Sequence, residues 1–496
     1  MYRLLAHRLP APVDAASAFR ALFGDAPHAV WLDSSDGSGW SYLASAAEAR
    51  TDWQDGDIFA ELADGCAAHP IDASEAPPGM AFRLGWVGWF GYELWHSTAA
   101  RRPRSSTHDS AFVFVDRMLA IDAAGSAWLV ALDTPAGEEW LAAAGAVLAS
   151  AHAGAGDGAD AGDAGGGAAG VGAAVAGGAA DAANAAGAGI AGGAADAANA
   201  YADMVVAARL SVDGTDVDAG EPGAARVVWR HDDDAYLRLV AHCLDAIARG
   251  DAYQLCLTNT ATVSCRIDPR VAYERLRALS PTHHGGFLRI GDTALLSASP
   301  EVFLRVDADR TVSTRPIKGT RRRGGDAAED AALRAELSAS EKERAENLMI
   351  VDLMRNDLSR VARLGTVRVS SLLTVESYAQ VHQLVSTVEA ELAEGITGVD
   401  AVRALFPAGS MTGAPKIRAI ELLAELERGP RGIYSGAFGY LGLDGAVELA
   451  MVIRSIVVTP DGATIGAGGG ITTLSDPAEE LAEMHLKAAP LLAALR

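Results

Sequence analysis

Runs of β-branched and aromatic residues recur along the chain without regular spacing, and they predict strands. Two runs lie in the first third, at 29–33 (AVWLD) and 112–115 (FVFV). Five more follow in the second half, at 254–260, 294–297, 366–369, 436–440 and 450–458. Helical segments fall irregularly between them, so a strict alternation of strand and helix is absent. The pattern predicts an α+β fold with large mixed or antiparallel sheets and helices packed outside.

Two helices have start signals that can be identified residue by residue. The first begins at Ser338 or Ser340, because either serine has a glutamate three residues on, and it continues through Asp357. The second begins at Asp476, with Pro477 in its first turn and Glu479 completing a capping box. Each helix carries a pair of acidic residues on one face.

Residues 151–200 interrupt this pattern, because they are almost entirely Ala, Gly, Asp and Asn. The decapeptide AGGAADAANA occurs there twice, at 176–185 and 191–200. A segment without aromatic residues cannot offset its chain entropy by burial, so we expect a disordered insertion and not a structural repeat. It divides the chain into an N-terminal α+β region at 1–150 and a larger domain at 228–496.

The charge balance excludes several classes of partner. The chain of 496 residues has 41 basic and 64 acidic side chains, a net charge of −23, which opposes binding to nucleic acid and to anionic membranes. Its four cysteines show no metal-ligand spacing, and a chain of this size needs no disulfide framework. No window is apolar enough to span a membrane, and the N-terminus lacks a secretory apolar region. We therefore expect a cytoplasmic protein.

The acidic pairs predict a cation site if the two helices face each other. Glu343 and Glu346 are three residues apart on the first helix, and Glu480 and Glu483 are three apart on the second, followed by Lys487 on the same face. Across a cleft, such carboxylates would repel unless a cation such as Mg²⁺ lay between them. The spacing alone also fits a cap residue and a solvated charged face.

Two further segments favour anion binding without requiring it. The glycine-rich run at 464–472 (TIGAGGGIT) could expose backbone N–H groups to a carboxylate, or could form a turn or bulge. The run at 315–323 (RPIKGTRRR) places five cations within nine residues of an acidic protein. On sequence grounds the second run is equally a solvated basic loop.

Taken in order, these segments resemble the chorismate-utilising enzymes, the family that includes the large subunits of anthranilate synthase and aminodeoxychorismate synthase. The resemblance covers about 233–490, and a weaker likeness extends to 31–34 (WLDS) and 85–93 (GWVGWFGYE). The segments that carry it are 250–255 (GDAYQL), 299–301 (SPE), 315–320 (RPIKGT), 345–357 (AENLMIVDLMRND), 413–416 (GAPK), 431–436 (RGIYSG), 453–455 (IRS) and 466–468 (GAG).

The resemblance implies a ligand set. By position, Glu346 and Glu483 correspond to direct Mg²⁺ ligands, with Glu343 and Glu480 held through water, and the metal would join the protein to a substrate carboxylate. Glu301 corresponds to the general acid/base that protonates the leaving C4 hydroxyl, which requires a carboxyl with a raised pKa. The residues implied to bind the rest of chorismate are Gly319, Thr320, Ser410, Tyr434, Arg454, Gly466, Ala467, Gly468 and Lys487. The alternatives are a cap role for Glu343, a salt bridge for Arg454 and a strand-end carboxylate for Glu301.

Three positions discriminate within the family. Gln254 stands where isochorismate and salicylate synthases carry the Lys that activates water, which argues against water as the nucleophile. Lys318 stands where anthranilate synthases usually have Ala. Gln383 occupies the position of the anthranilate synthase His, and His382 lies one residue earlier, so on a strand it would point to the opposite face and is either catalytic or packed.

These positions favour the aminodeoxychorismate synthase branch, in which ammonia replaces the C4 hydroxyl of chorismate. The resemblance casts Lys318 as a nucleophile that attacks C2, and this role requires burial or neighbouring arginines to lower its pKa. The alternative is a lysine that binds a carboxylate and makes only an ion pair. No G-x-C-x-G segment is present, so ammonia from glutamine would need a separate class I glutaminase subunit. The alternatives are anthranilate synthase component I, less plausibly an isochorismate or salicylate synthase, and a chorismate-binding protein without catalysis.

Overall fold

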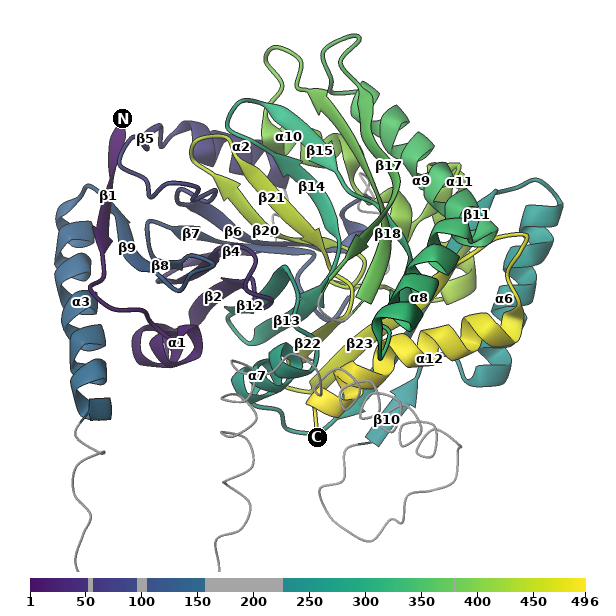
Figure 1. Ribbon diagram of the computed structural model, residues 1–496, viewed down its shortest axis with the longest axis horizontal. Helices are drawn as coiled ribbons and strands as arrows, with labels where there is room; N and C mark the ends of the chain where they lie inside the picture. The colour runs from purple at the N-terminus through teal and green to yellow at the C-terminus, as the bar shows by residue number, and fades with distance from the viewer. Residues whose placement is uncertain (52–56, 96–104, 157–225, 379–380) are drawn as a thin grey trace, which may run out of the picture.

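The computed structural model describes residues 1–51, 57–95, 105–156, 226–378 and 381–496, which form two large β-sheets packed between layers of helices (Figure 1). The first sheet has 13 strands in the order β10 (Arg226–Trp229), β11 (Gln254–Ser264), β23 (Gly462–Ile471), β22 (Ser455–Thr459), β13 (Thr293–Ser299), β12 (His284–Ile290), β2 (His28–Asp33), β3 (Ser41–Ala46), β8 (Arg117–Ile121), β9 (Ala127–Leu132), β1 (Tyr2–Arg8) and β5 (Ile71–Asp72), with β19 (Gly413–Ala414) also beside β11.

The second sheet has ten strands in the described part of the chain. Their order is β16 (Ile317–Arg322), β18 (Val381–Glu391), β15 (Thr311–Thr314), β14 (Val302–Val306), β21 (Val447–Met451), β20 (Ala437–Gly442), β6 (Gly85–Phe90), β7 (Ser110–Val115) and β4 (Ala49–Thr51), with β17 (Arg368–Ser377) also beside β18. Each pair of neighbouring described strands is antiparallel, except the pair of β1 with β5, which is parallel. The predicted fold class is confirmed.

Alternation of side chains along the strands creates the layers. On β2, Val30 points into the apolar core between the two sheets, and its neighbour Trp31 points into the core beneath the helices. On β12, Leu288 and Phe287 divide in the same way. Successive side chains of a strand point to opposite faces, so a strand that is apolar on both faces requires cover on both.

The helices supply that cover. On the outer face of the 13-stranded sheet lie α1 (Ala15–Phe23), α3 (Pro135–Gly156), α6 (Asp233–Ala248), α7 (Pro269–Leu279), α11 (Lys416–Glu427) and α12 (Pro477–Ala494). On the outer face of the ten-stranded sheet lie α2 (Ile58–Ala67), α9 (Glu341–Ser359) and α10 (Gly398–Leu405), and α8 (Ala327–Ala339) packs on β16, β17 and β18. Two short 3₁₀ helices, η1 (Tyr92–Trp95) and η4 (Gly409–Met411), complete the described elements used below.

The two sequence regions on either side of the insertion share both sheets. Strand β2 pairs with β12 in the first sheet, and β6 pairs with β20 in the second. The insertion predicted at 151–200 begins inside α3, because residues 151–156 continue that helix; its remainder lies outside the described residues.

Both predicted helix starts are confirmed, although Glu343 and Glu479 do not complete capping boxes in the structure, and one predicted strand is wrong. Ser340 caps α9 by accepting a hydrogen bond from the backbone N–H of Glu343, whereas Ser338 lies in α8; Asp476 caps α12. The run at 450–458 is two strands in different sheets, β21 and β22, separated by a crossing at residues 452–454. Apolar periodicity does not distinguish a continuous strand from one that changes sheet.

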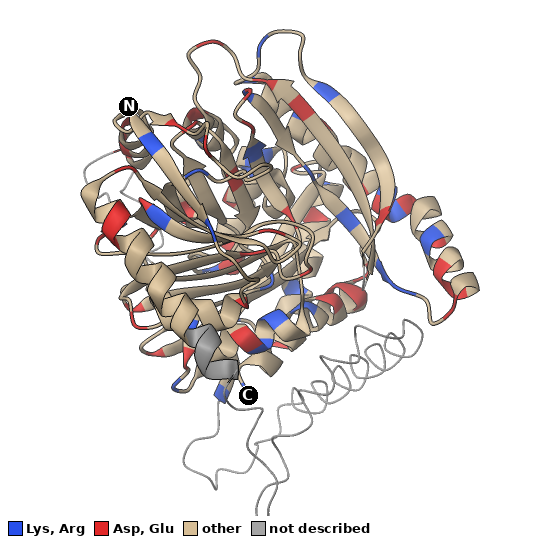
Figure 2. Ribbon diagram, turned by 60° about the vertical axis from the view of Figure 1, so that its left-hand side comes forward, with Lys and Arg blue, Asp and Glu red and all other residues tan. Residues whose placement is uncertain are grey.

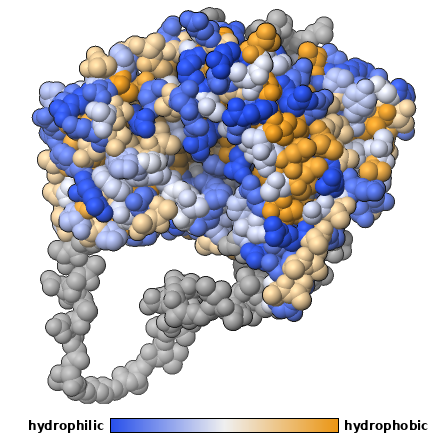
Figure 3. Space-filling model, turned by 45° about the horizontal axis from the view of Figure 1, so that its top comes forward, coloured by the Kyte–Doolittle hydropathy of each residue, from blue (hydrophilic) through white to orange (hydrophobic). Residues whose placement is uncertain are grey.

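Charged residues are distributed over the whole fold. Figure 2 shows Lys and Arg interspersed with Asp and Glu on both sheets and on the helices. Figure 3 shows the same mixture on one face, where polar side chains surround a hydrophobic area on its right half. None of the described helices has the length and apolar character needed to cross a membrane.

Candidate active site

Lys318 lies on β16, at a place where the strand departs from regular pairing with β18. The register between these strands shifts between Ile317 and Thr320, and Gly319 adopts a φ of 84° there. A Cβ on Gly319 would lie 2.8 Å from Leu337 of α8 and 3.0 Å from Glu343 of α9. The absence of a side chain therefore lets β16 approach the acidic face of α9.

The basic segment is a strand with paired arginines, not a solvated loop. Arg315 bonds to Glu376 at 2.6 Å, Arg321 to Glu336 at 2.6 Å and Arg323 to Asp330 at 2.7 Å, and Arg322 pairs with Glu329. These acids come from α8 and β17, elements whose contact with the segment the sequence did not predict. Lys318 differs from the arginines, because its electrostatic neighbours are the predicted site carboxylates.

The pKa of Lys318 is raised, contrary to the expectation of a lowered value. Burial acts to lower it, but the carboxylates of Glu346, Glu301 and Glu483 outweigh that effect. The expectation relied on burial and on the nearby arginines; burial does act in that direction, but each arginine is paired with an acid of its own. In this state the lysine is an ammonium ion at the centre of the acidic cluster.

Glu301 lies between β13 and β14 and is only 8% exposed. Burial raises its pKa, against the opposing influence of Lys318, a hydrogen bond from Ser410 and the charges of Lys487 and Arg454. A cavity of about 10 Å³ beside it has mainly apolar walls, including Phe303, Ile350 and Met354. Burial thus favours the protonated form of Glu301, and four residues implied by the family resemblance, Lys318, Ser410, Lys487 and Arg454, act on its carboxyl.

The glycine-rich run lies in a strand, β23, whose register with β11 is continuous, so it is neither a turn nor a bulge. Gly466 permits close approach, since a Cβ there would lie 2.2 Å from the ring of Tyr434. Strand β22 pairs with β23 only as far as Ile465, so among the described strands the second edge of β23 has no neighbour from Gly466 onward. That edge has no strand partner, which leaves its backbone N–H groups open to an anion, whereas the side chain of Ala467 is buried in the helix-covered core.

Arg454 lies where the chain passes from β21 to β22, and its φ of 48° is in the left-handed region. This crossing ends the pairing of β22 at the start of the free edge of β23. Lys487 reaches the same edge from α12, where its ammonium donates to the carbonyl of Gly468 at 2.8 Å. Lys487 therefore reaches this strand edge, and the charge of Arg454 acts on the nearby Glu301.

The four predicted metal ligands lie on α9 and α12, but they do not form a ready-made metal site. Among the described residues no group of three or more His, Cys, Asp or Glu side chains has a metal-holding geometry. Instead Glu483 pairs with Lys487 at 2.7 Å, Glu480 with Lys342 at 3.3 Å and Glu343 with Arg321 at 3.5 Å.

Glu346 is the exception among these carboxylates. It is 7% exposed and makes no hydrogen bond or ion pair with another described residue. Burial raises its pKa to about 6, partly offset by Lys318. A buried carboxylate without a partner, together with three more carboxylates on the facing helices, fits the all-oxygen ligand set of Mg²⁺.

Gln254 belongs to this site, although the sequence identified it only as a discriminating position. It is fully buried, and neither its amide nitrogen nor its oxygen has a hydrogen-bond partner. A Cβ on Gly470 would lie 2.5 Å from that nitrogen and 3.5 Å from the Lys318 ammonium, so both groups approach one point beside β23. Buried polar groups are normally satisfied, and an unsatisfied amide is the signal that marks this residue.

His382 is 1% exposed and is held on both nitrogens. Nδ1 lies 2.7 Å from the hydroxyl of Ser377, and Nε2 lies 3.0 Å from Asp330. These contacts favour the packed alternative. Gln383, its neighbour on β18, is opposite Thr320 in the strand register and points to the other face.

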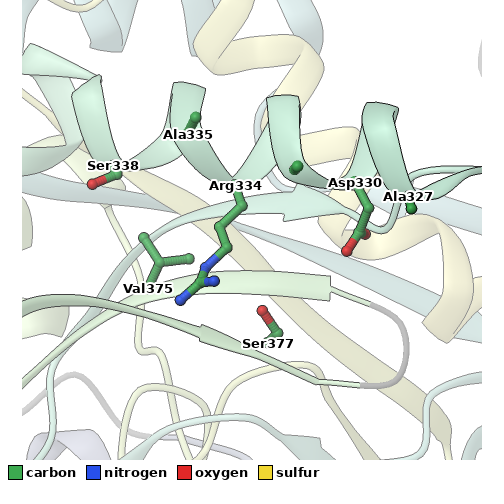
Figure 4. Close-up of a pocket in the computed structure, with 8 residues that line it drawn as sticks. Ala327, Asp330, Arg334, Ala335, Ser338, Val375 and Ser377 are labelled. Atoms are coloured by element: carbon green, nitrogen blue, oxygen red, sulfur yellow. The ribbon is translucent and has the colours of Figure 1, made fainter.

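The structure also contains a cavity of about 540 Å³ between α8 and β17, in which Arg334 points toward Val375 and Ser377 (Figure 4). None of the residues implied to bind substrate or metal lines it. It is therefore separate from the cluster around Lys318.

A buried ion pair behind the site was not predicted from the sequence. Arg431 uses all five N–H groups: it donates to both oxygens of Glu427, to the carbonyls of Met411 and Cys256, and to the hydroxyl of Ser435. Met411 and Ser435 directly follow Ser410 and Tyr434 in the chain, so this guanidinium fixes two segments that carry predicted substrate-binding residues. In the sequence, the only sign of Arg431 was its position in the family-like segment 431–436.

A second acid binds the same loop from the N-terminal region. Glu93 of η1 accepts hydrogen bonds from the backbone N–H groups of Arg431 at 2.7 Å and Gly432 at 3.0 Å. The weaker likeness at 85–93 thus includes a residue that holds the loop carrying Tyr434.

Known proteins resemble both the sequence and the fold. Residues 194–493 match the family described as chorismate binding enzyme. An aminodeoxychorismate synthase of Streptomyces pristinaespiralis is 40% identical over 100% of this chain and 65% of its own length, so the chain spans about two thirds of that relative. Anthranilate synthase component 1 of Thermus thermophilus is 46% identical over 55% of this chain and 59% of its own length.

A solved structure agrees with these sequence matches. Anthranilate synthase component I of Streptococcus pneumoniae superposes with a TM-score of 0.68 at 25% identity, covering 92% of each chain. The family match covers more than half of this chain and includes Lys318, Glu301 and both acidic helices. The chain belongs to the chorismate binding enzyme family.

Proposed function

We propose that this chain is the chorismate-aminating component of an aminodeoxychorismate synthase, which supplies 4-amino-4-deoxychorismate for 4-aminobenzoate and folate synthesis. The observation that carries the proposal is the position of Lys318, whose ammonium shares one point beside β23 with the unpartnered amide of Gln254. The 40% identity to an aminodeoxychorismate synthase over the whole chain supports it.

The chemistry assigned to the chain needs one nucleophile and one acid. Neutral Lys318 attacks C2 of chorismate, the ring double bonds shift, and the C4–O bond breaks as Glu301 gives its proton to the leaving hydroxyl, releasing water. Ammonia then attacks C4, the C2–N bond to the lysine breaks, and the Glu301 carboxylate takes up the proton from the ammonia nitrogen. Because the carboxylates raise the pKa of Lys318, the lysine must lose its proton after these charges are compensated.

The binding groups follow from the same geometry. Glu346 and Glu483, with Glu343 and Glu480 through water, would hold Mg²⁺, which supplies positive charge to bind a substrate carboxylate. Arg454, Lys487 and the free edge of β23 would bind the other carboxylate and the enolpyruvyl group. Ammonia would come from a separate class I glutaminase subunit in the cytoplasm, since this chain has no G-x-C-x-G nucleophile segment.

Anthranilate synthase component I is the second candidate, favoured by the 46% identity to the Thermus thermophilus enzyme and the superposition on the Streptococcus pneumoniae structure. The two reactions differ in the carbon that is aminated. Anthranilate carries its amino group at the C2 position and is fluorescent, whereas the proposed product keeps its ring unsaturation pattern and has an amine at C4.

Product identification separates the two. The purified chain is incubated with chorismate, Mg²⁺ and ammonium, and the products are resolved by liquid chromatography with mass and fluorescence detection. We expect 4-amino-4-deoxychorismate with ammonium and no turnover with glutamine alone. Anthranilate as the sole product would refute the proposal, and glutamine-driven turnover by the pure chain would refute the need for a glutaminase. Glu139→Ala, on the exposed face of α3, is the control for loss of activity in Glu346→Ala and Glu483→Ala.

A further inference from the structure

We propose that Lys342 is a built-in counter-ion of the metal site, which neutralises the facing carboxylates when Mg²⁺ is absent and competes with Mg²⁺ for them. This inference rests on the metal site of the proposed function. It assigns a role to a residue that neither the sequence segments nor the substrate-binding set included.

Lys342 lies within reach of the predicted metal ligands. It is the second residue of α9, and its ammonium lies 3.3 Å from the carboxylate of Glu480 on α12. Glu346 on its own helix and Glu483 on α12 add further attraction. One cation is therefore directed toward three of the four predicted metal ligands, two of which lie on α12.

The two members of the Lys342–Glu480 pair differ in their exposure to solvent. The Glu480 side chain is 3% exposed and also accepts a hydrogen bond from Ser475 at 2.7 Å, so it is fixed, whereas the Lys342 side chain is 33% exposed. A lysine has a flexible four-carbon stem and a strongly hydrated head. When another cation takes the carboxylates, the ammonium can move into solvent while the carboxylates stay in place.

Two other basic residues also pair with predicted metal ligands. Lys487 pairs with Glu483, and Arg321 pairs with Glu343. Lys487 and Arg321 have other ligands as well, namely the carbonyl of Gly468 and the carboxylate of Glu336. Lys342 has no hydrogen bond or ion pair with any other described acid, so its position is set by the metal ligands alone.

Competition follows from charge and space. Mg²⁺ binds carboxylate oxygens at about 2.0–2.1 Å in a strict octahedral geometry, and an ammonium bonded to the same oxygens occupies part of that shell. Two cations that share carboxylates also repel each other. Removal of the Lys342 charge should therefore strengthen Mg²⁺ binding and weaken the metal-free fold.

The test uses the full chain, freed of metal with a chelator, and compares wild type with Lys342→Met, which keeps the apolar stem and removes the charge. Arg344→Met is the matched control: it lies on the same helix, is exposed, and bonds to the carbonyl of Ser338 instead of the acidic cluster. Mg²⁺ affinity is measured by titration calorimetry. We expect Lys342→Met to bind Mg²⁺ about tenfold more tightly, equivalent to about 1.4 kcal/mol, and Arg344→Met to match wild type.

Thermal unfolding gives an independent readout. In chelator, Lys342→Met should melt at a lower temperature than wild type, and saturating Mg²⁺ should raise its Tm by more than it raises that of wild type, because ligand binding to the folded state adds stability. Unchanged or weaker Mg²⁺ binding by Lys342→Met would overturn the inference, as would an equal gain in Arg344→Met.

These outcomes do not depend on turnover. If wild type binds Mg²⁺ and Lys342→Met binds it no better, the inference fails while the proposed function stands. If neither protein binds Mg²⁺, both the inference and the metal site of the proposed function fail. If the product is anthranilate, only the assigned reaction fails.

Discussion

The buried pair of Glu427 and Arg431 allows a quantitative prediction of its own. Glu427→Gln preserves size and shape but removes the negative charge, in a place where the side chains of Arg431 and Glu427 are 1% and 3% exposed. The amide also places an N–H donor against a guanidinium that already donates through Nε at 2.8 Å and Nη2 at 2.6 Å. The variant therefore leaves a buried cation without its counter-ion.

The expected cost is about 3–5 kcal/mol, the range for breaking one partner of a buried ion pair. For a chain of this size a change of 1 kcal/mol moves Tm by about 2 °C or less, so Tm should fall by several degrees. The assay is thermal and urea unfolding of the metal-free protein. The matched control is Glu421→Gln, which removes an exposed partner of Arg418 at 3.4 Å and should cost about 1 kcal/mol or less.

A double-mutant cycle tests the reasoning itself. Arg431→Met removes the unpaired charge, so Glu427→Gln combined with Arg431→Met should cost less than the sum of the two single changes. Some loss should remain, because the carbonyls of Met411 and Cys256 would lack a donor. Two results would refute the assignment of a buried, fully compensated pair. One is a loss of unfolding free energy in Glu427→Gln no larger than that in Glu421→Gln. The other is additive losses in the double variant.

Burial raises the pKa of Glu93 to about 7, so between about pH 4.5 and 7 the folded chain keeps a proton that the unfolded chain has lost. The free energy of unfolding should therefore fall as the pH rises through this range. Glu93→Gln should reduce the slope of Tm against pH. Gly466→Ala should displace Tyr434, because the added methyl would lie 2.2 Å from its ring, and the displacement should raise KM for chorismate. Gly145→Ala is the control: its methyl would lie 3.8 Å from the nearest side chain and should leave KM unchanged. Chorismate without ammonia should leave an adduct on the Lys318 peptide, seen by mass spectrometry and lost in Lys318→Ala; an intact wild-type peptide under turnover conditions would contradict the covalent role.

Local signals in the sequence were sufficient for several strands and two helix starts. The runs at 29–33 and 112–115 became β2 and β7, and the cap residues Ser340 and Asp476 start α9 and α12. Caps and apolar runs act through neighbours within a few residues, and such effects are visible in one sequence. The order of strands in the two sheets depends on long-range pairing and was not predicted.

The errors share a physical origin in contacts between distant segments. The run at 450–458 is apolar on either side of Arg454 and Ser455 because both of its strands are buried, although they lie in different sheets. The arginines after Lys318 look like a free basic loop until Glu336 and Asp330 of α8 are placed against them. The expected lowering of the Lys318 pKa failed because carboxylates from distant segments surround the lysine and outweigh burial, while the neighbouring arginines are already paired.

The family resemblance identified residues whose proximity no local pattern could give. Glu301, Lys318 and Glu346 are neighbours in space, although they come from a strand connection, a strand and a helix. Spacing alone gave only the pairs on α9 and α12. Gln254 and Arg431 needed the structure, because an unpartnered amide and a fully occupied guanidinium are properties of the folded surroundings.

The sharing of both sheets between the N-terminal and C-terminal regions has a consequence for synthesis on the ribosome. Strand β2 pairs with β12, and His284 lies 256 residues after His28. At roughly 5–20 residues per second, the partner of β2 emerges on the order of 13–50 s later. During that interval the edges of the early strands are open to pairing with other chains. Dependence on chaperones should therefore be greatest for nascent chains that end before β12, a property that ribosome-bound truncations of increasing length would reveal.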